Sequence, residues 1–122
     1  MTGVQTCALP IWDLYTYGYE QGKKIIAEKE FDAVQCVNDA CAIGLIKALS
    51  EAGKKVPEDV SVAGFDDIMA SQYHIPALST VAQPKEEMAE KTVNLLFQLK
   101  DQPESGIKHE LLETEFVDRD TI

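Results

Sequence analysis

The stretch VPEDVSVAGFDD at residues 56–67 decides the fold, together with FDAVQCVND at residues 31–39, which lies a short helix before it. Each stretch is an apolar strand that ends in carboxylate or carboxamide side chains, with Asn38 after the first strand and Asp66 after the second. In an open α/β sheet, ligands bind outside the carboxyl ends of the strands. The two strands are therefore predicted to bring Asn38 and Asp66 to the edge where a small polar ligand would bind.

Helices and strands alternate along the rest of the chain. Hydrophobic periodicity predicts helices at residues 17–29, 39–52 and 84–100, and one short helical turn at 69–73. Strands are predicted at residues 31–37, 60–65, 78–82 and 110–117. Gly53 suits a left-handed residue at a helix end, and Pro84 suits the first position of a helix. The predicted fold class is therefore α/β, with a mostly parallel sheet flanked by helices.

The first residues of the chain are excluded from the fold. Residues 2–11, TGVQTCALPI, correspond codon for codon to a widely used sequencing adapter when they are back-translated. A native apolar N-terminus or a clipped signal peptide is the alternative, but no basic residue precedes the apolar run and Pro10 interrupts it. We expect residues 1–11 to be a non-native scar, and the rest to be the C-terminal piece of a longer protein.

Charge and composition exclude several classes of protein. The 122 residues include 11 Lys and Arg against 21 Asp and Glu, which gives a net charge of −10. An acidic surface repels the phosphate backbone, so this segment is not predicted to bind DNA itself. No apolar run approaches the roughly 20 residues that span a bilayer. Cys36 and Cys41 fit a reducing cytosol better than a disulfide framework, and Cys and His at zinc-ligand spacing are lacking. We expect neither a metal nor a cofactor.

Together with ACAIGLIKALSEAG at residues 40–53, the two strand motifs resemble the effector-binding domain of the lactose-repressor/galactose-repressor (LacI/GalR) family of bacterial transcription regulators. The resemblance extends from about residue 13 to residue 119. It implies a two-lobed, periplasmic-binding-protein-like (type I) sensor, of which this chain holds one incomplete lobe. Residues 12–83 and 107–119 would belong to the C-terminal lobe, and residues 84–106 to a crossover helix of the missing N-terminal lobe.

The resemblance implies that Asn38, Asp66 and Gln83 contact the ligand. A carboxylate accepts hydrogen bonds from two hydroxyls, and a carboxamide both donates and accepts, so these groups suit a sugar. A structural role is the alternative for Asn38, because Asn is a good helix N-cap, and a weaker one for Asp66, because one carboxylate of the pair is enough to start a turn. For Gln83 the alternative is an ordinary surface amide. Asp39 and Asp67 are expected to cap and orient. The resemblance also implies an aromatic pocket residue near the start of the native chain, with three candidates left open: Trp12, Tyr15 and Tyr17.

The helix at residues 39–52 is apolar over a wide arc. One face can cover the sheet and holds Cys41, Leu45, Ala48, Leu49 and Ala52. Ile43 and Ile46 lie well off that face, and exposed isoleucines in a row indicate a partner surface. Burial under a neighbouring loop is the alternative. The resemblance implies that Ile43 and Ile46 lie at a homodimer interface, and we expect His74 at this surface too.

The implied function is effector sensing and dimerisation within a cytoplasmic transcriptional repressor. A small effector, a sugar or sugar derivative, would bind between the lobes, and operator DNA would be bound only by a missing helix-turn-helix headpiece. A secreted solute-binding protein of a transporter is the alternative, which the upstream sequence would decide. An enzyme is not expected, because His74 and His109 have no Cys or Ser in a nucleophile-like setting and no glycine-rich phosphate loop is present. The identity of the effector and of the operator stays open.

Overall fold

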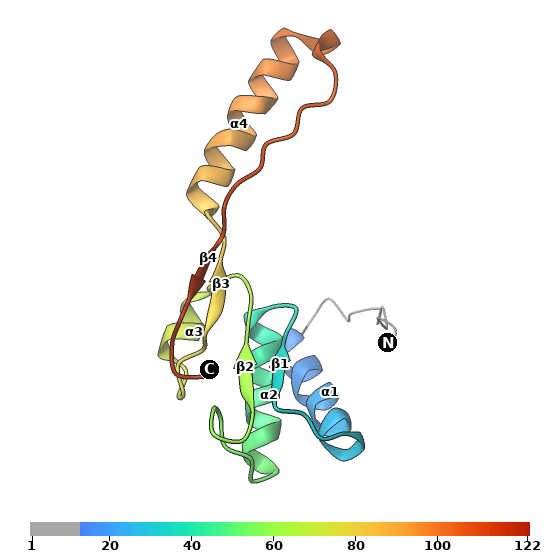
Figure 1. The fold of residues 1–122 in the computed structure, drawn as a ribbon. Helices are drawn as coiled ribbons and strands as arrows, with labels where there is room; N and C mark the ends of the chain where they lie inside the picture. The colour runs from blue at the N-terminus through green and yellow to red at the C-terminus, as the bar shows by residue number, and fades with distance from the viewer. Residues whose placement is uncertain (1–12) are drawn as a thin grey trace.

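The computed structural model describes residues 13–122, and its α/β architecture confirms the predicted fold class (Figure 1). Its helices are α1 (Leu14–Glu28), α2 (Asp39–Glu51), α3 (Met69–Tyr73) and α4 (Lys85–Asp101), followed by a 3₁₀ turn, η1 (Pro103–Ser105). Its strands are β1 (Ala33–Gln35), β2 (Ser61–Ala63), β3 (Thr80–Ala82) and β4 (Glu115–Val117). The predicted adapter scar and the aromatic candidate Trp12 lie outside the described residues.

The described strands lie beside one another in chain order. β1 and β2 pair in parallel, and β3 and β4 pair antiparallel. Between these pairs, Ala63 forms a parallel bridge with Ser79, and the Asp66 amide donates to the Val81 carbonyl over 2.9 Å. The last strand is shorter than the predicted 110–117, because its partner β3 offers only three residues for pairing. Leu111, which the prediction placed in that strand, is 97% exposed.

The hydrophobic core lies where α2 packs on the sheet. Its buried members are Ala42, Leu45, Ile46 and Leu49 of α2 with Val60, Val62 and Leu78 from the strand regions. Burying one side chain of this size contributes about 1.5–3 kcal/mol. The core therefore holds α2 firmly against β2 and the start of β3, the strands that Asp66 and Gln83 follow.

Glycines bring the backbones of α1 and α2 into direct contact. A Cβ on Gly18 would lie 2.1 Å from the carbonyl oxygen of Cys41, and one on Gly44 would lie 2.1 Å from the carbonyl oxygen of Tyr15. Only a residue without a Cβ permits so close an approach. Ile25 of α1 has a smaller part in this contact, since it is 38% exposed.

The arrangement of α2 corrects the prediction for Ile46. This side chain is only 4% exposed and belongs to the core, so the expected exposure of Ile46 toward a partner subunit is wrong. Helix α2 is covered by the sheet on one side and by α1 on another, where Leu45 and Ala48 meet Gly22. The apolar arc of α2 is therefore wide because two elements of the same chain, the sheet and α1, cover it. Ala52, predicted to face the sheet, is exposed.

Helix α4 projects away from the other helices (Figure 1), and none of its residues is buried by the described chain. Among the apolar side chains at helical spacing along α4, Met88, Leu96 and Leu99 are exposed and Leu95 is half-buried. Val93 and Phe97 add to the exposed apolar surface. Neither α4 nor any other helix within residues 13–122 is long and apolar enough to cross a membrane.

Cys36 and Cys41 are both free thiols. Burial raises the pKa of the Cys36 thiol to about 12, and burial also raises the pKa of Cys41. Because the thiolate is the reactive form of cysteine, both side chains stay protonated and inert near neutral pH.

Candidate functional site

The side chains predicted to bind the ligand follow neighbouring strands at the same edge of the sheet. Asn38 comes after β1, Asp66 after β2 and Gln83 after β3. The backbone bond from Asp66 to Val81 holds the ends of β2 and β3 together. The structure therefore brings the predicted residues to one edge, and their contact with a ligand stays a prediction.

Gln83 fixes the orientation of the Asp66 carboxylate. The Nε2 group of Gln83 donates to Oδ1 of Asp66 over 2.5 Å. The Lys85 ammonium donates to the backbone carbonyl of Asp66, and it lies 3.3 Å from that of Asp67. Both aspartates have a positive φ, 105° at Asp66 and 47° at Asp67, which Asp tolerates better than most residues. Two side chains thus support a turn that presents Asp66 at the edge.

Asn38 has the structural role that the sequence left open. Its Oδ1 accepts a hydrogen bond from the Cys41 amide over 2.9 Å and caps α2. Capping engages only the carbonyl oxygen of the side chain, and Nδ2 is a separate donor. The cap therefore holds the amide still at the strand end and is compatible with a ligand contact through Nδ2.

Asp39 lies beneath this edge and is fully buried. Its carboxylate accepts hydrogen bonds from the Ile68 amide at 2.8 Å, the Ser71 hydroxyl at 2.6 Å and the Thr80 hydroxyl. A Cβ on Gly64 would lie 2.1 Å from its Oδ1, so glycine makes room for the carboxylate. Each donor is neutral, and the N-terminus of α2 adds favourable partial charge. Asp39 thus has the orienting role expected for it, through hydrogen bonds to three separate segments of the chain.

Asp67 orients the C-terminal segment through Arg119. The Arg119 Nη2 atom lies 2.7 Å from Oδ1 of Asp67 in a mostly buried ion pair. Close by, the Thr121 hydroxyl donates to the Val62 carbonyl over 2.7 Å and accepts from the Ser79 amide over 2.8 Å. The sequence analysis did not single out Arg119 or Thr121. The sequence held a signal for Arg119, because it is the only arginine of this acidic chain.

A hollow of about 480 Å³ lies where β3 leads into α4. Its lining residues are Asp67, Ala82, Gln83, Pro84, Lys85, Glu86 and Glu87. Gln83 is the one of the three predicted ligand residues that lines it. The hollow thus borders the strand-end edge on the side from which α4 departs.

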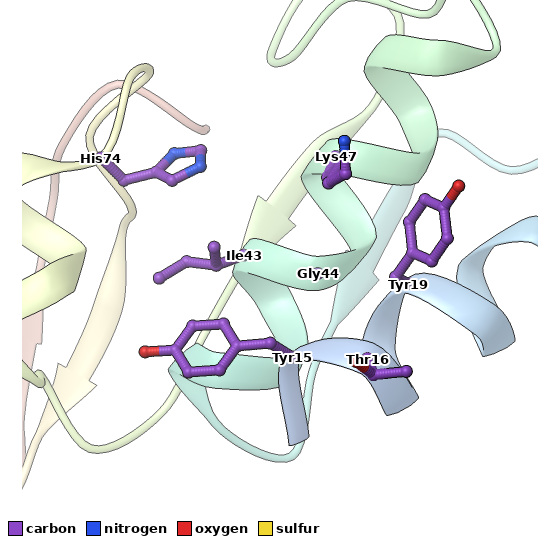
Figure 2. A pocket seen from close by; sticks show the side chains of 7 residues that line it. All are labelled: Tyr15, Thr16, Tyr19, Ile43, Gly44, Lys47 and His74. Atoms are coloured by element: carbon purple, nitrogen blue, oxygen red, sulfur yellow. The ribbon is translucent and has the colours of Figure 1, made fainter. Parts of the chain in front are cut away.

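A second hollow, of about 260 Å³, lies between α1, α2 and the end of α3 (Figure 2). It is lined by Tyr15, Thr16, Tyr19, Ile43, Gly44, Lys47 and His74. Figure 2 shows the Ile43 side chain extending from α2 toward His74, with the Tyr15 ring on the same side. Two of the predicted interface residues therefore share one surface, while Ile46 lies in the core.

Charged side chains form one margin of this second hollow. The Tyr19 hydroxyl donates to Glu51 over 2.6 Å, and Lys47 forms an ion pair with Glu51 at 2.8 Å. The ammonium groups of Lys23 and Lys47 lie 5.0 and 5.7 Å from the centre of the Tyr19 ring. The hydrogen bond to Glu51 raises the pKa of Tyr19. An apolar floor with a polar margin is the usual composition of a protein–protein contact.

Comparison with known proteins identifies the family to which this architecture belongs. The family described as periplasmic binding protein-like domain matches residues 8–122. The chain belongs to this family. MalR, an HTH-type transcriptional regulator from Clostridium butyricum, is 41% identical over 104 residues, which cover 84% of this chain and 31% of MalR. The chain spans about a third of the length of the curated relatives it matches.

Solved structures agree with this assignment to the periplasmic binding protein-like family. A LacI family transcriptional regulator from Enterococcus faecalis V583, with bound ribose, is 34% identical with a TM-score of 0.80, over 88% of this chain and 40% of that one. The lac repressor dimer, bound to operator and the anti-inducer ONPF, is 32% identical with a TM-score of 0.80, over 87% of this chain and 32% of that one. These relatives are transcriptional regulators, and they confirm the resemblance to the LacI/GalR regulators.

Proposed function

We propose that this chain is the effector-sensing and dimerisation part of a DNA-binding transcriptional regulator of the LacI/GalR type. The observation that carries the proposal is the strand-end edge, where Asn38, Asp66 and Gln83 come together and Gln83 holds the Asp66 carboxylate. The parent protein works in the cytoplasm, binds operator DNA through a headpiece outside this chain and performs no chemistry. The LacI-type relatives favour this function over a transporter's solute-binding protein.

The effector is a sugar or a sugar derivative. Asp66 supplies an acceptor for hydroxyl groups, and Gln83 and Asn38 supply amides that both donate and accept. Hydrogen bonds to a charged acceptor are the stronger kind, so Asp66 contributes most. The ribose bound in the Enterococcus faecalis relative supports this class of ligand. A difference in sugar affinity between two lobe arrangements would then shift the operator-binding state.

The lobes divide the chain at the strand-end edge. Residues 13–83 and 107–119 form one lobe, and residues 84–106 belong to a second lobe whose remainder lies outside this chain. The division is supported by α4, which leaves the sheet after Pro84 and has no buried residue (Figure 1). The effector would bind between the two lobes, against the carboxyl ends of the strands.

The proposed function has a direct test in the full-length protein. We expect it to select a DNA sequence from a random pool, and we expect a neutral sugar to change its affinity for that sequence. Calorimetric titration with ribose, glucose, galactose, lactose and maltose identifies the sugar. If no DNA sequence is selected, the regulator assignment is wrong. If DNA is selected but no sugar produces heat or changes the DNA affinity, the effector class is wrong.

The partner in the regulator is a second copy of the same chain. The contact surface is the hollow around Tyr15, Ile43 and His74, where Tyr15 is 44% exposed and the other two are half-buried. Most of the lining is apolar, and the lac repressor relative is a dimer. Ile46 does not take part, because the core buries it. A two-fold contact presents the same surface from both subunits, so one substitution acts twice.

Replacing Ile43 by glutamate should therefore convert the full-length dimer to monomers. The change would place two carboxylates in a mostly apolar contact, and a cost near 1.4 kcal/mol for each is about a hundredfold loss of dimer affinity. Sedimentation equilibrium measures the change. Ile25→Glu is the matched control, since Ile25 lies ten residues farther along α1 from Tyr15, about 15 Å by helical rise. A dimer of undiminished strength in Ile43→Glu would place the interface elsewhere.

A further inference from the structure

The turn after β2 contains two consecutive residues with positive φ, Asp66 and Asp67. Residues other than glycine hold such a backbone only where their surroundings fix it. The Asp66 amide donates to the Val81 carbonyl over 2.9 Å, and the Asp67 carboxylate pairs with Arg119 at 2.7 Å. These contacts engage one amide and one side chain, and they leave the two carbonyl oxygens of the turn to a separate donor.

Lys85 is that donor. Its ammonium donates to the carbonyl of Asp66 and lies 3.3 Å from the carbonyl of Asp67. Among the described residues that line the hollow of about 480 Å³, Lys85 is the one basic residue, and Asp67, Glu86 and Glu87 are acidic. Hydrogen bonds from a charged donor are stronger than those between neutral groups. The ammonium is therefore well suited to hold both carbonyls of the turn.

The position of Lys85 in α4 indicates a role outside the helix. It is the first residue of α4, where the partial positive charge of the helix end disfavours a lysine and favours Glu86 and Glu87. On the other side of Pro84, the Nε2 group of Gln83 donates to the Asp66 carboxylate over 2.5 Å. Gln83 thus holds the side chain of Asp66, and Lys85 holds its backbone.

We propose that Lys85 is a positioning residue for effector binding. By holding the carbonyls of Asp66 and Asp67, it fixes the turn in the conformation that directs the Asp66 carboxylate to the effector. A carboxylate that is fixed before binding loses less conformational freedom when the ligand arrives. The ammonium acts through the backbone and does not contact the effector. This inference rests on the proposed function and adds a residue that the sequence analysis did not single out.

Calorimetric titration of the full-length protein tests this role, with the tightest-binding sugar of the neutral panel as the probe. Lys85→Met removes the ammonium and should weaken sugar affinity by about fivefold. Lys85→Arg restores a charged donor and should recover most of the lost affinity. Lys91→Met is the matched control, because Lys91 lies on the same helix and pairs instead with Glu87 at 3.1 Å and Glu110 at 3.4 Å. This control should bind sugar as the wild type does.

An Asp66→Gly background separates positioning from direct contact. Glycine adopts the φ of 105° at this position without strain and removes the carboxylate. If Lys85 acts through Asp66, adding Lys85→Met to this background should weaken sugar affinity by less than about twofold, because the effects of a coupled pair are not additive. A lysine that contacts the sugar itself would still cost the full fivefold.

The carbonyl ¹³C signals of residues 66 and 67 give a measurement that needs no sugar. In the ligand-free protein, Lys85→Met should move both signals upfield, because each carbonyl loses a hydrogen bond. The positioning role is wrong if Lys85→Met moves neither signal or keeps wild-type sugar affinity, if Lys85→Arg binds no better than Lys85→Met, if Lys91→Met loses as much, or if the full loss persists in Asp66→Gly. Absence of any sugar heat in the wild type would instead contradict the proposed function, and the carbonyl signals would still report the Lys85 contact.

Discussion

Replacing Asp66 by alanine in the full-length regulator should weaken effector binding by more than tenfold, because a hydrogen bond to a charged group contributes about 1.5–3 kcal/mol. The carboxylate follows β2 at the candidate ligand edge, and Gln83 already fixes its orientation. Little conformational entropy is then lost when it binds a hydroxyl. Isothermal titration with the sugar identified for the wild type measures the change.

Two further variants serve as controls for Asp66→Ala. Asp66 has a φ of 105°, where alanine is strained, so Asp66→Asn is the milder change that removes the charge and keeps a side chain suited to this conformation. Asp32→Ala removes an exposed carboxylate at the opposite end of β1 and should leave sugar affinity unchanged. Thermal unfolding of each variant separates lost binding from lost folding. Wild-type affinity in both Asp66 variants would remove Asp66 from the site.

The sequence predicted the elements better than their lengths. Each predicted helix and strand is present, and Gly53 has the expected left-handed conformation with φ of 74°. The strands are shorter because an apolar run marks burial and β-propensity, whereas strand length depends on the partner. Val37 and Leu111 were placed in strands by their apolar character, yet both are exposed.

The sequence could not predict which element covers each side of α2. A helical wheel shows an apolar arc, but not whether a sheet, another helix or a second subunit covers each part of it. Gly18 and Gly44 permit α1 to lie directly on α2, and at this contact Gly22 meets Leu45 and Ala48, which the sequence assigned to the face toward the sheet. Ile46 was misplaced because the core between α2 and the sheet buries it with Val60 and Val62, while Ile43 lines the hollow beside His74.

The candidate ligand edge was predictable because alternating strands and helices indicate a parallel sheet, in which the ends of neighbouring strands lie at one edge. A polar residue directly after a buried strand lies at the end of that strand, whatever the rest of the fold does. The network beneath the edge was not predictable. Ser71 and Thr80 reach Asp39 from segments about thirty to forty residues away, and polar residues of these types are common at the surface.

Substitutions on the exposed surface of α4 are expected to show the largest difference in stability effect between this chain and the full-length protein. In this chain alone, Leu96 is 65% exposed, so Leu96→Ala should change the free energy of unfolding by less than about 0.5 kcal/mol. In the full-length protein the same substitution should cost about 2–5 kcal/mol, because the second lobe would bury that side chain. Urea unfolding of both proteins measures the difference. Leu49→Ala, in the core, is the matched control and should destabilise both.

Hydrogen exchange gives an independent measurement of the same property. Amides of residues 85–101 in the isolated chain should exchange much faster than those of α2, since a helix with no buried residue opens at little free-energy cost. The uncovered side chains also favour association, because an apolar face of this kind binds other apolar surfaces. The comparison therefore requires a sample shown to be monomeric by sedimentation. Equal and strong protection of α4 and α2 in such a sample would mean that α4 belongs to the same compact lobe, and that the division at residues 84–106 is wrong.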